Sequence, residues 1–346
     1  MINYFIKFIQ ILLFINVFLI LLSSGEIHGP ITRDFKEWLD NNGYKFFNYS
    51  REEFDVYGSY GGKKTSTDKI TKIPIIFVHG NSDGALKMPG IYSTGFSKTI
   101  EYFESNGYTS SELYVTTWGD RNTDNAGMRT HSCEFVQYIR NFMEAVIRYT
   151  ESDFINIISH SMGVTLARKA VIGTMIIDIL DTRHKCIVGR SLGEKVNIFI
   201  GLSGANYGIC SCSGPEAALE ATCNDLNGFF PGDKCQSYIP INNTIPPDVT
   251  SCNDDHTNLS CLKPAKYSKI LYDMNNSQTV IGKKVFSFWS LDDELLGSCS
   301  RVWGRPTAFI PNSSGVRVFS KLGHEQVKDN TISEQYSIIY NFEEEK

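Results

Sequence analysis

Short apolar runs and longer amphipathic segments alternate along most of the chain. Apolar runs of strand length lie at residues 73–78, 113–117, 154–159, 196–202, 285–289 and 316–319. Segments with helical periodicity lie between them, at residues 96–105, 128–149, 162–173 and 325–342. Strands that alternate with helices of this length predict an α/β fold, with a mostly parallel sheet covered by helices on both faces.

The alternation is interrupted at residues 204–267, where Gly, Pro, Asn, Asp, Ser and Cys dominate. About sixty residues without regular structure would be unusual inside a compact domain. The cysteines in this segment instead predict a disulfide-tied cap inserted between two strands. We therefore expect a single domain over residues 26–346, with a cap insertion at about 204–267.

The N-terminus is typical of a secretory leader. Lys7 precedes an apolar run at residues 8–22, and the small residues Ser23, Ser24 and Gly25 follow. This pattern predicts a signal peptide at residues 1–25, cleaved after Gly25, and hence a secreted, extracellular protein. An uncleaved anchor is the alternative, although the run is shorter than the roughly 20 residues that span a bilayer.

Five N-x-S/T triplets are consistent with passage through a glycosylating secretory route. They begin at Asn48, Asn242, Asn258, Asn275 and Asn312.

Charge and length narrow the range of partners. The formal charge is −5, and it becomes −6 once Lys7 is removed with the leader. No basic cluster is present that could neutralise a run of phosphates, so nucleic acid is not an expected partner. A chain of this size can bury a sufficient core by itself, which makes a monomer the simplest expectation.

The cysteine pattern favours disulfides over a metal site. All nine cysteines follow the predicted leader, and six of them lie between Cys210 and Cys261. In a secreted protein most would be oxidised to disulfides, and the odd count leaves at least one outside such a pair. A zinc site that includes His256 is the alternative, but the cluster lacks paired CxxC spacing.

The strongest chemical signal is the sequence Ser159-His-Ser161-Met-Gly163, which joins a predicted strand to a predicted helix. A sharp turn there exposes the Ser161 hydroxyl at a helix N-terminus, where backbone N–H groups and the helix dipole favour developing negative charge. The pattern is G-x-S-x-G with Ser159 in place of the first glycine. It predicts that Ser161 is an acyl-transfer nucleophile.

Such a serine needs a base and an acid, which follow it in the order acid, then histidine. His324 is the expected base because it follows the last predicted strand, whereas His184 lies too close to the serine and His256 lies in the cap. Asp292, in the turn after the strand at 285–289, is the expected acid. Asp293 is the alternative, and either would orient the imidazole.

A tetrahedral intermediate also needs hydrogen-bond donors aimed at its oxyanion. The backbone N–H of Met162 follows the nucleophile directly. The second donor is expected to be the backbone N–H of Asn81, in the His79-Gly80-Asn81 loop after the first predicted strand.

These motifs together resemble the class 2 lipases, which include secreted nematode proteins related to small bacterial lipases. The segments that carry the resemblance are Gly29-Pro-Ile-Thr-Arg-Asp-Phe, Phe77-Val-His-Gly80, Thr117-Trp-Gly, Ile158-Ser-His-Ser-Met-Gly-Val164, Ala167-Arg-Lys-Ala, Gly204-Ala-Asn-Tyr-Gly208 and Leu322-Gly-His-Glu325. The resemblance implies an α/β-hydrolase fold and hydrolysis of lipid carboxylic esters without a metal or organic cofactor. It also implies the triad Ser161, Asp292 and His324, with Asn81 and Met162 as the oxyanion hole.

The expected function is therefore that of a secreted serine lipase or carboxylesterase that acts on lipid esters at a lipid–water interface. The same triad would also serve an acyltransferase. A lipid-binding protein that keeps the fold without catalysis is the alternative from a different class, because fold alone never proves activity.

Overall fold

The structure is a computed structural model that describes residues 26–90, 93–178, 185–213, 217–232, 237–239, 260–263, 266–297, 300–302 and 305–344. The predicted leader at residues 1–25, with its cleavage site, lies outside the described residues. So do two of the five glycosylation triplets, those of Asn242 and Asn258. Within the described part, no helix combines the length and apolar character needed to cross a membrane.

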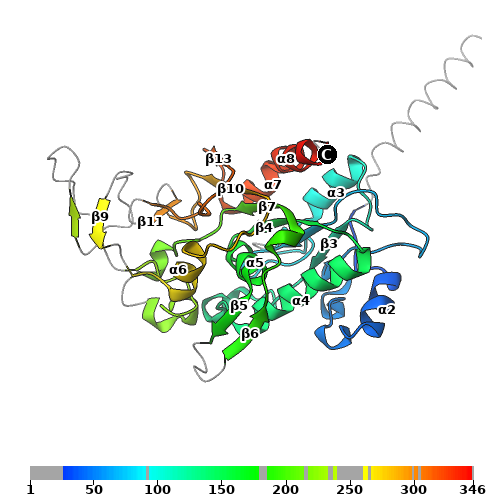
Figure 1. Cartoon of the computed structure of the whole chain (residues 1–346), viewed down its shortest axis with the longest axis horizontal. Helices are drawn as coiled ribbons and strands as arrows, with labels where there is room; N and C mark the ends of the chain where they lie inside the picture. The colour runs from blue at the N-terminus through cyan, green and yellow to red at the C-terminus, as the bar shows by residue number, and fades with distance from the viewer. Residues whose placement is uncertain are drawn as a thin grey trace, which may run out of the picture.

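A seven-stranded sheet forms the centre of the molecule (Figure 1), with the strand order β1-β3-β2-β4-β7-β10-β13. The strands are β1 (Ser59–Tyr60), β2 (Ile75–Val78), β3 (Leu113–Thr116), β4 (Ile155–His160), β7 (Val196–Leu202), β10 (Lys284–Ser290) and β13 (Gly315–Phe319). The short strand β1 pairs antiparallel with β3, and every other neighbouring pair is parallel. The expected mostly parallel sheet is confirmed.

Helices cover both faces of this sheet. The helices are α2 (Arg33–Asn41), α3 (Ser97–Ser105), α4 (Cys133–Thr150), α5 (Met162–Ile172), α6 (Lys269–Asn275), α7 (His324–Asn330) and α8 (Ile332–Glu344). In Figure 1, α3 and α8 lie on one side of the strands, and α2 and α4 lie on the other. This layered arrangement agrees with the expected α/β class.

The side chains of each strand point alternately to the two faces of the sheet, which explains why the protein has two hydrophobic cores. In β2, Ile76 and Val78 belong to the core cluster that contains α2, α4 and α5 residues, whereas Ile75 and Phe77 belong to the cluster that contains α3 and α8 residues. All four side chains are buried because successive side chains of a strand point to opposite faces and both faces are covered. A buried strand of this kind reads as a continuous apolar run, as the sequence does here.

Two of the predicted helices differ in detail from the observed ones. The helix predicted at 128–149 begins only at Cys133, because the Ser132 hydroxyl accepts a hydrogen bond from the Phe135 N–H and caps it. The preceding residues form the short 3₁₀ helix η3 (Thr123–Met128). The helix predicted at 325–342 is two helices, α7 and α8, which meet at Thr331.

Other elements carry weaker sequence signals and were not predicted. They are β1, α2, α6, the hairpin of β5 (Thr174–Ile177) with β6 (Lys185–Gly189), and the small paired strands β11 (Arg301–Val302) and β12 (Arg305–Pro306).

The region predicted to be a cap contains little regular structure where it is described. Three 3₁₀ turns follow β7, namely η5 (Cys210–Cys212), η6 (Ala217–Leu219) and η7 (Ala221–Cys223), and a hairpin of β8 (Ser237–Ile239) and β9 (Ser260–Lys263) lies further along. A disulfide joins Cys212 to Cys223, and a second joins Cys133 in α4 to Cys186 in β6. Two cysteines of the cluster considered for zinc are thus bonded to each other. The described residues contain no His, Cys, Asp and Glu group that could hold a metal.

Candidate active site

Ser161 lies at the junction between β4 and α5, in a conformation that L-residues rarely adopt. Its backbone angles are φ 54° and ψ −130°, and it occupies the N-cap position of α5. A non-glycine residue held in this region is strained, and such strain persists where the surrounding structure enforces it. The sequence thus forms the sharp strand-to-helix turn that its small residues predict.

The glycines around Ser161 are required by close packing. A Cβ atom on Gly163 would lie 2.3 Å from the carbonyl oxygen of His79, and one on Gly80 would lie 2.8 Å from the Cβ of Ser161. Ser159, which stands where the motif has its first glycine, is buried and donates a hydrogen bond from its hydroxyl to the Ile200 carbonyl (3.2 Å). A serine fits this position because its one polar group has a partner.

His324 is held by Asp293, and the expectation that Asp292 fills this role is wrong. The Nδ1 atom of His324 lies 2.9 Å from both carboxylate oxygens of Asp293, and both side chains are buried. Asp292 is exposed and accepts a hydrogen bond from the backbone N–H of Lys321 (2.6 Å). Since adjacent residues after a strand point in different directions, only one of the two carboxylates can reach the imidazole.

The turn after β10 fixes the Asp293 carboxylate. Its Oδ1 atom also accepts hydrogen bonds from the backbone N–H groups of Leu295 (3.1 Å) and Leu296 (3.0 Å). Burial alone would raise the pKa of Asp293, but the hydrogen bond and charge interaction with His324 and the Leu296 N–H outweigh it and lower the pKa. The carboxylate is therefore ionised at neutral pH and can stabilise a positively charged imidazole.

Four of the expected site residues line one pocket, and Asp292 is not among them. A cavity of about 360 Å³ is lined by Asn81, Ser161, Met162 and His324, together with Gly80 and Glu325. Within the described part of the chain, the buried Nε2 atom of His324 has no hydrogen-bond partner. With Nδ1 facing Asp293, this nitrogen is the one available to exchange a proton with a group in the pocket.

Two buried cations anchor the loop that carries Asn81. Arg129 donates to the Asn81 Oδ1 atom (2.7 Å) and to the Ser82 hydroxyl (2.8 Å), and the Asn81 amide nitrogen donates to the Ala126 carbonyl (3.0 Å). Lys328 forms an ion pair with Asp83 (2.7 Å). Every polar side chain between residues 81 and 83 is therefore tied to a neighbouring element, which fixes the backbone N–H of Asn81.

Lys328 also links this loop to the helix that carries His324. Its ammonium group is fully buried and contacts both Asp83 and Glu325 (3.0 Å), and Lys328 lies one helical turn after His324. Burial alone would lower the pKa of Lys328, but the two carboxylates outweigh it and raise the pKa above its usual value. This pair was not predictable from the sequence, since a charged residue on a short helix usually faces solvent.

His160 is buried beside the candidate site. Its Nε2 atom lies 3.1 Å from the backbone oxygen of His324, and the centres of the two rings are 4.7 Å apart. Burial lowers the pKa of His160 to about 4, so it is neutral at pH 7. Because neutral imidazole carries one N–H, Nε2 is the donor and His160 supports the main chain of His324.

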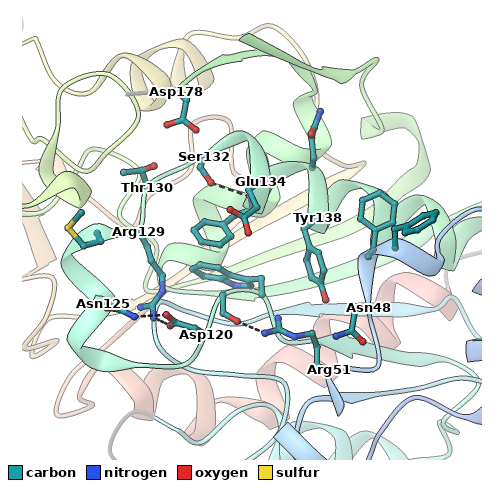
Figure 2. A pocket seen from close by; sticks show the side chains of 17 residues that line it. Asn48, Arg51, Asp120, Asn125, Arg129, Thr130, Ser132, Glu134, Tyr138 and Asp178 are labelled. Atoms are coloured by element: carbon teal, nitrogen blue, oxygen red, sulfur yellow. Dashed lines mark hydrogen bonds and ion pairs between the residues drawn. The ribbon is translucent and has the colours of Figure 1, made fainter. Parts of the chain in front are cut away.

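A larger and more open cavity lies next to the candidate site, on the other side of η3. It has a volume of about 870 Å³, and Figure 2 shows Arg129 pointing toward Asp120 and Asn125 on its border. Asn125 and Met128 of η3 line this cavity, whereas Thr123, Ala126 and Gly127 of the same helix line the Ser161 pocket. None of the expected site residues lines the larger cavity. Because residues of η3 line both cavities, this helix forms a wall between the two.

The solved structures that match the chain include several lipases. The Aspergillus fumigatus lipase B structure is 13% identical with a TM-score of 0.38, and the match covers 74% of this chain and 49% of that one. A Paleococcus ferrophilus monoacylglycerol lipase is 15% identical (TM-score 0.41, 78% and 95% covered), and the mature Bacillus licheniformis lipase BlEst2 is 12% identical (TM-score 0.46, 81% and 97% covered). This chain thus spans about half the length of the fungal lipase. No curated protein matches it.

The family comparison covers most of the chain. The model of the family "Lipase (class 2)" matches residues 72–337, from just before β2 into the first half of α8. The matched range contains Ser161, Asp293 and His324. The chain belongs to the class 2 lipase family and has the α/β-hydrolase fold.

Proposed function

We propose that this chain is a serine hydrolase of lipid carboxylic esters, with Ser161 as nucleophile, His324 as base and Asp293 as the acid. The observation that carries the proposal is the buried pair of Asp293 and His324. The other ring nitrogen of His324, Nε2, has no partner among the described residues, and His324 lines the same pocket as the strained Ser161. Family membership supports carboxylic-ester hydrolysis as the reaction class. A protein that only bound lipid would have no use for this combination.

The proposed reaction has two halves. His324 Nε2 takes the proton of the Ser161 hydroxyl as Oγ attacks the ester carbonyl, and the backbone N–H groups of Asn81 and Met162 donate to the resulting oxyanion. The C–O bond to the alcohol then breaks, the alcohol leaves with the proton from Nε2, and an acyl-enzyme remains. Water attacks this ester with the same base, which releases the carboxylic acid and restores Ser161.

The pocket suits an ester with an apolar acyl group. Part of its wall is apolar, formed by Met162, Ala205, Ile209, Phe229 and Leu295, among others. Hydroxyl and carboxylate groups lie elsewhere in the lining, from Thr123, Ser211, Glu220 and Thr222. We propose that the apolar wall holds the acyl chain and that the polar groups accept the hydroxyls of an alcohol such as a glycerol unit.

We also propose that the protein is secreted and acts as a monomer at a lipid–water interface. The apolar run after Lys7 and the two disulfides support an extracellular location. Of the described glycosylation triplets, that of Asn275 is the least suited to modification. Its amide nitrogen donates to the Asn206 carbonyl (2.8 Å) and to the Tyr267 hydroxyl (3.0 Å), and a glycan would replace one of the two hydrogens that form these bonds.

Hydrolysis of p-nitrophenyl esters of increasing acyl length tests the proposal. The disulfide-bonded wild-type protein should release nitrophenol, and Ser161→Ala should not. Ser159→Ala is a matched control, because it removes a neighbouring hydroxyl that lies outside the pocket lining. Tight lipid binding by a wild-type protein with no turnover would favour the lipid-binding alternative. Transfer of most acyl groups to added glycerol or cholesterol would instead favour an acyltransferase.

A further inference from the structure

Arg168, on the helix α5 that follows Ser161, is a buried cation with no carboxylate partner among the described residues. Its side chain is 2% exposed. One terminal nitrogen donates to the side-chain oxygens of Asn206 (2.7 Å) and Asn275 (3.0 Å), and the other donates to the backbone oxygen of Met274 (3.4 Å). All of these acceptors are neutral, and Nε has no hydrogen-bond partner within the described residues.

A buried charge of this kind is costly. Burial lowers the pKa of Arg168 to about 10, and no Asp or Glu is among the groups that offset the effect. Buried charges in proteins are normally paired with an opposite charge, because leaving water is expensive for an unpaired ion. The Arg168 charge is therefore offset only by neutral groups in the described part of the chain.

Arg168 borders a cavity in which an anion can bind beside it. The cavity has a volume of about 240 Å³ and lies between the C-terminal part of α6, the segment 277–283 and the segment 310–314. Its polar lining consists of Arg168, Lys283, Asn275, Ser277, Gln278, Thr279, Asn312 and Ser314. Arg168 and Lys283 are the cationic residues of this lining, and the Lys283 ammonium lies over the Phe154 ring, 3.4 Å from its centre. The other polar residues are neutral, and no Asp or Glu lines the cavity in the described part of the chain.

We propose that this cavity binds a phosphate group, with Arg168 as its principal charged partner and Lys283 as the second cation. The planar guanidinium matches the oxygen spacing of phosphate and can donate two parallel hydrogen bonds. Hydroxyl and amide groups around the cavity can donate to the remaining oxygens. Phosphate suits this lining better than a carboxylate does, because it carries more charge and more acceptor oxygens.

The site would be separate from the Ser161 pocket, with which it shares no lining residue. The two are connected through α5, because Arg168 lies two helical turns after Ser161 on this helix. Arg168 also holds Asn206, which follows β7 next to the Ala205 wall of the Ser161 pocket. The phosphate could be free in solution or part of a lipid headgroup, and the proposal does not depend on which reaction Ser161 performs.

Thermal unfolding of the full-length secreted protein tests the proposal. Inorganic phosphate, glycerol 3-phosphate and acetate are each titrated at constant ionic strength. Phosphate should raise the Tm in a saturable way, by about 3 to 6 °C at a hundredfold excess over its Kd. Gln278→Glu changes one exposed lining residue almost isosterically and places a carboxylate in the cavity, so it should abolish the rise without preventing folding. Lys283→Gln should weaken it.

The controls separate a specific site from general charge effects. Arg33→Met removes an exposed cation far from the cavity and should leave the phosphate-dependent rise unchanged. A rise with glycerol 3-phosphate alone would identify a headgroup as the source, and a rise with both ligands would identify the phosphate group itself. No saturable rise, an equal rise with acetate, or an undiminished rise in Gln278→Glu would overturn the proposal. A purely structural role for Arg168 predicts the first of these results.

Discussion

Two neighbouring carboxylates, Asp292 and Asp293, lie in opposite surroundings. Asp293 is buried against His324 and receives two backbone N–H groups, whereas Asp292 is exposed and contacts the Lys321 N–H. A carboxylate that orients a catalytic imidazole fixes its tautomer and stabilises its charged form. Only Asp293 is positioned to do this.

Asp293→Asn should therefore reduce ester hydrolysis strongly while Asp292→Asn does not. The amide can favour the wrong tautomer of His324, and the corresponding change in a well-studied serine protease lowers kcat about 10⁴-fold. We expect a loss of about a hundredfold or more for Asp293→Asn and less than about threefold for Asp292→Asn. Steady-state kinetics of the two variants, with circular dichroism to verify folding, provide the measurement. Equal losses, or a larger loss for Asp292→Asn, would contradict the assignment.

The sequence could predict the residue types of this site but not which carboxylate faces the histidine. Ser161 and His324 follow from motif and order, whereas Asp292 and Asp293 differ only in the direction that a short turn gives them. The buried ion pair of Asp83 and Lys328 was also beyond prediction, because its partners are 245 residues apart. A charge on a short helix gives no sign of a partner so distant in sequence.

Contacts between two elements fix the two sides of the candidate site relative to each other. The loop after β2 carries Asn81 and Asp83, and α7 carries His324 and Lys328. The Asp83–Lys328 pair joins these elements inside the protein, with both side chains buried. Arg129, which follows η3, fixes the same loop from its other side.

Lys328→Met should destabilise the fold by about 3 to 5 kcal/mol, because it leaves the buried Asp83 and the partly buried Glu325 without their cation. The double variant Asp83→Asn/Lys328→Met removes one of these stranded charges. It should lose at least about 1 kcal/mol less than the sum of the two single variants. Urea unfolding of all four proteins gives the coupling free energy. Additive losses would show that the pair does not link the loop to α7.

Elements with strong periodicity were predictable, and those shaped by local capping were not. The strands β2, β4, β7 and β10 lie close to their predicted ranges because both of their faces are buried, which produces continuous apolar runs. The start of α4 is displaced from its predicted position by the Ser132 cap. The helix α6 consists of seven residues and lay unrecognised just after the irregular segment.

Three buried histidines affect the stability of the whole molecule. Burial lowers the pKa of His79 to about 3 and the pKa values of His131 and His160 to about 4. Each is therefore neutral in the folded protein between its folded pKa and the ordinary value near 6.5 of the unfolded chain. Over this range the unfolded state binds more protons than the folded state.

The free energy of unfolding should therefore fall as the pH drops from about 6.5 toward 4. Each histidine that is protonated only after unfolding contributes up to about 1.4 kcal/mol per pH unit, so all three contribute up to about 4 kcal/mol per unit. Urea unfolding at several pH values measures this slope, and His131→Asn should reduce it by about one third. A free energy of unfolding that stays constant from pH 7 to 5 would contradict this account.

At the scale of the molecule, the parallel sheet, its covering helices and the class 2 lipase family were all predictable from sequence. The alternation of strand and helix patterns extends over most of the chain, and so does the set of motifs in their expected order. The pattern and the motifs therefore support the same fold. The cavity beside Arg168 was not predictable. It depends on α6 and on segments of irregular backbone, whose positions no periodicity encodes.

The measurement that tests the central claim most directly is covalent labelling with a fluorophosphonate probe, followed by mass spectrometry of the modified peptide. The account predicts one adduct per chain, located on Ser161, in wild-type protein that also hydrolyses esters. It predicts neither adduct nor hydrolysis in Ser161→Ala, and much slower labelling in Asp293→Asn than in Asp292→Asn. An unlabelled and inactive wild-type protein, or an adduct at another residue, would contradict the proposal that Ser161 is the nucleophile.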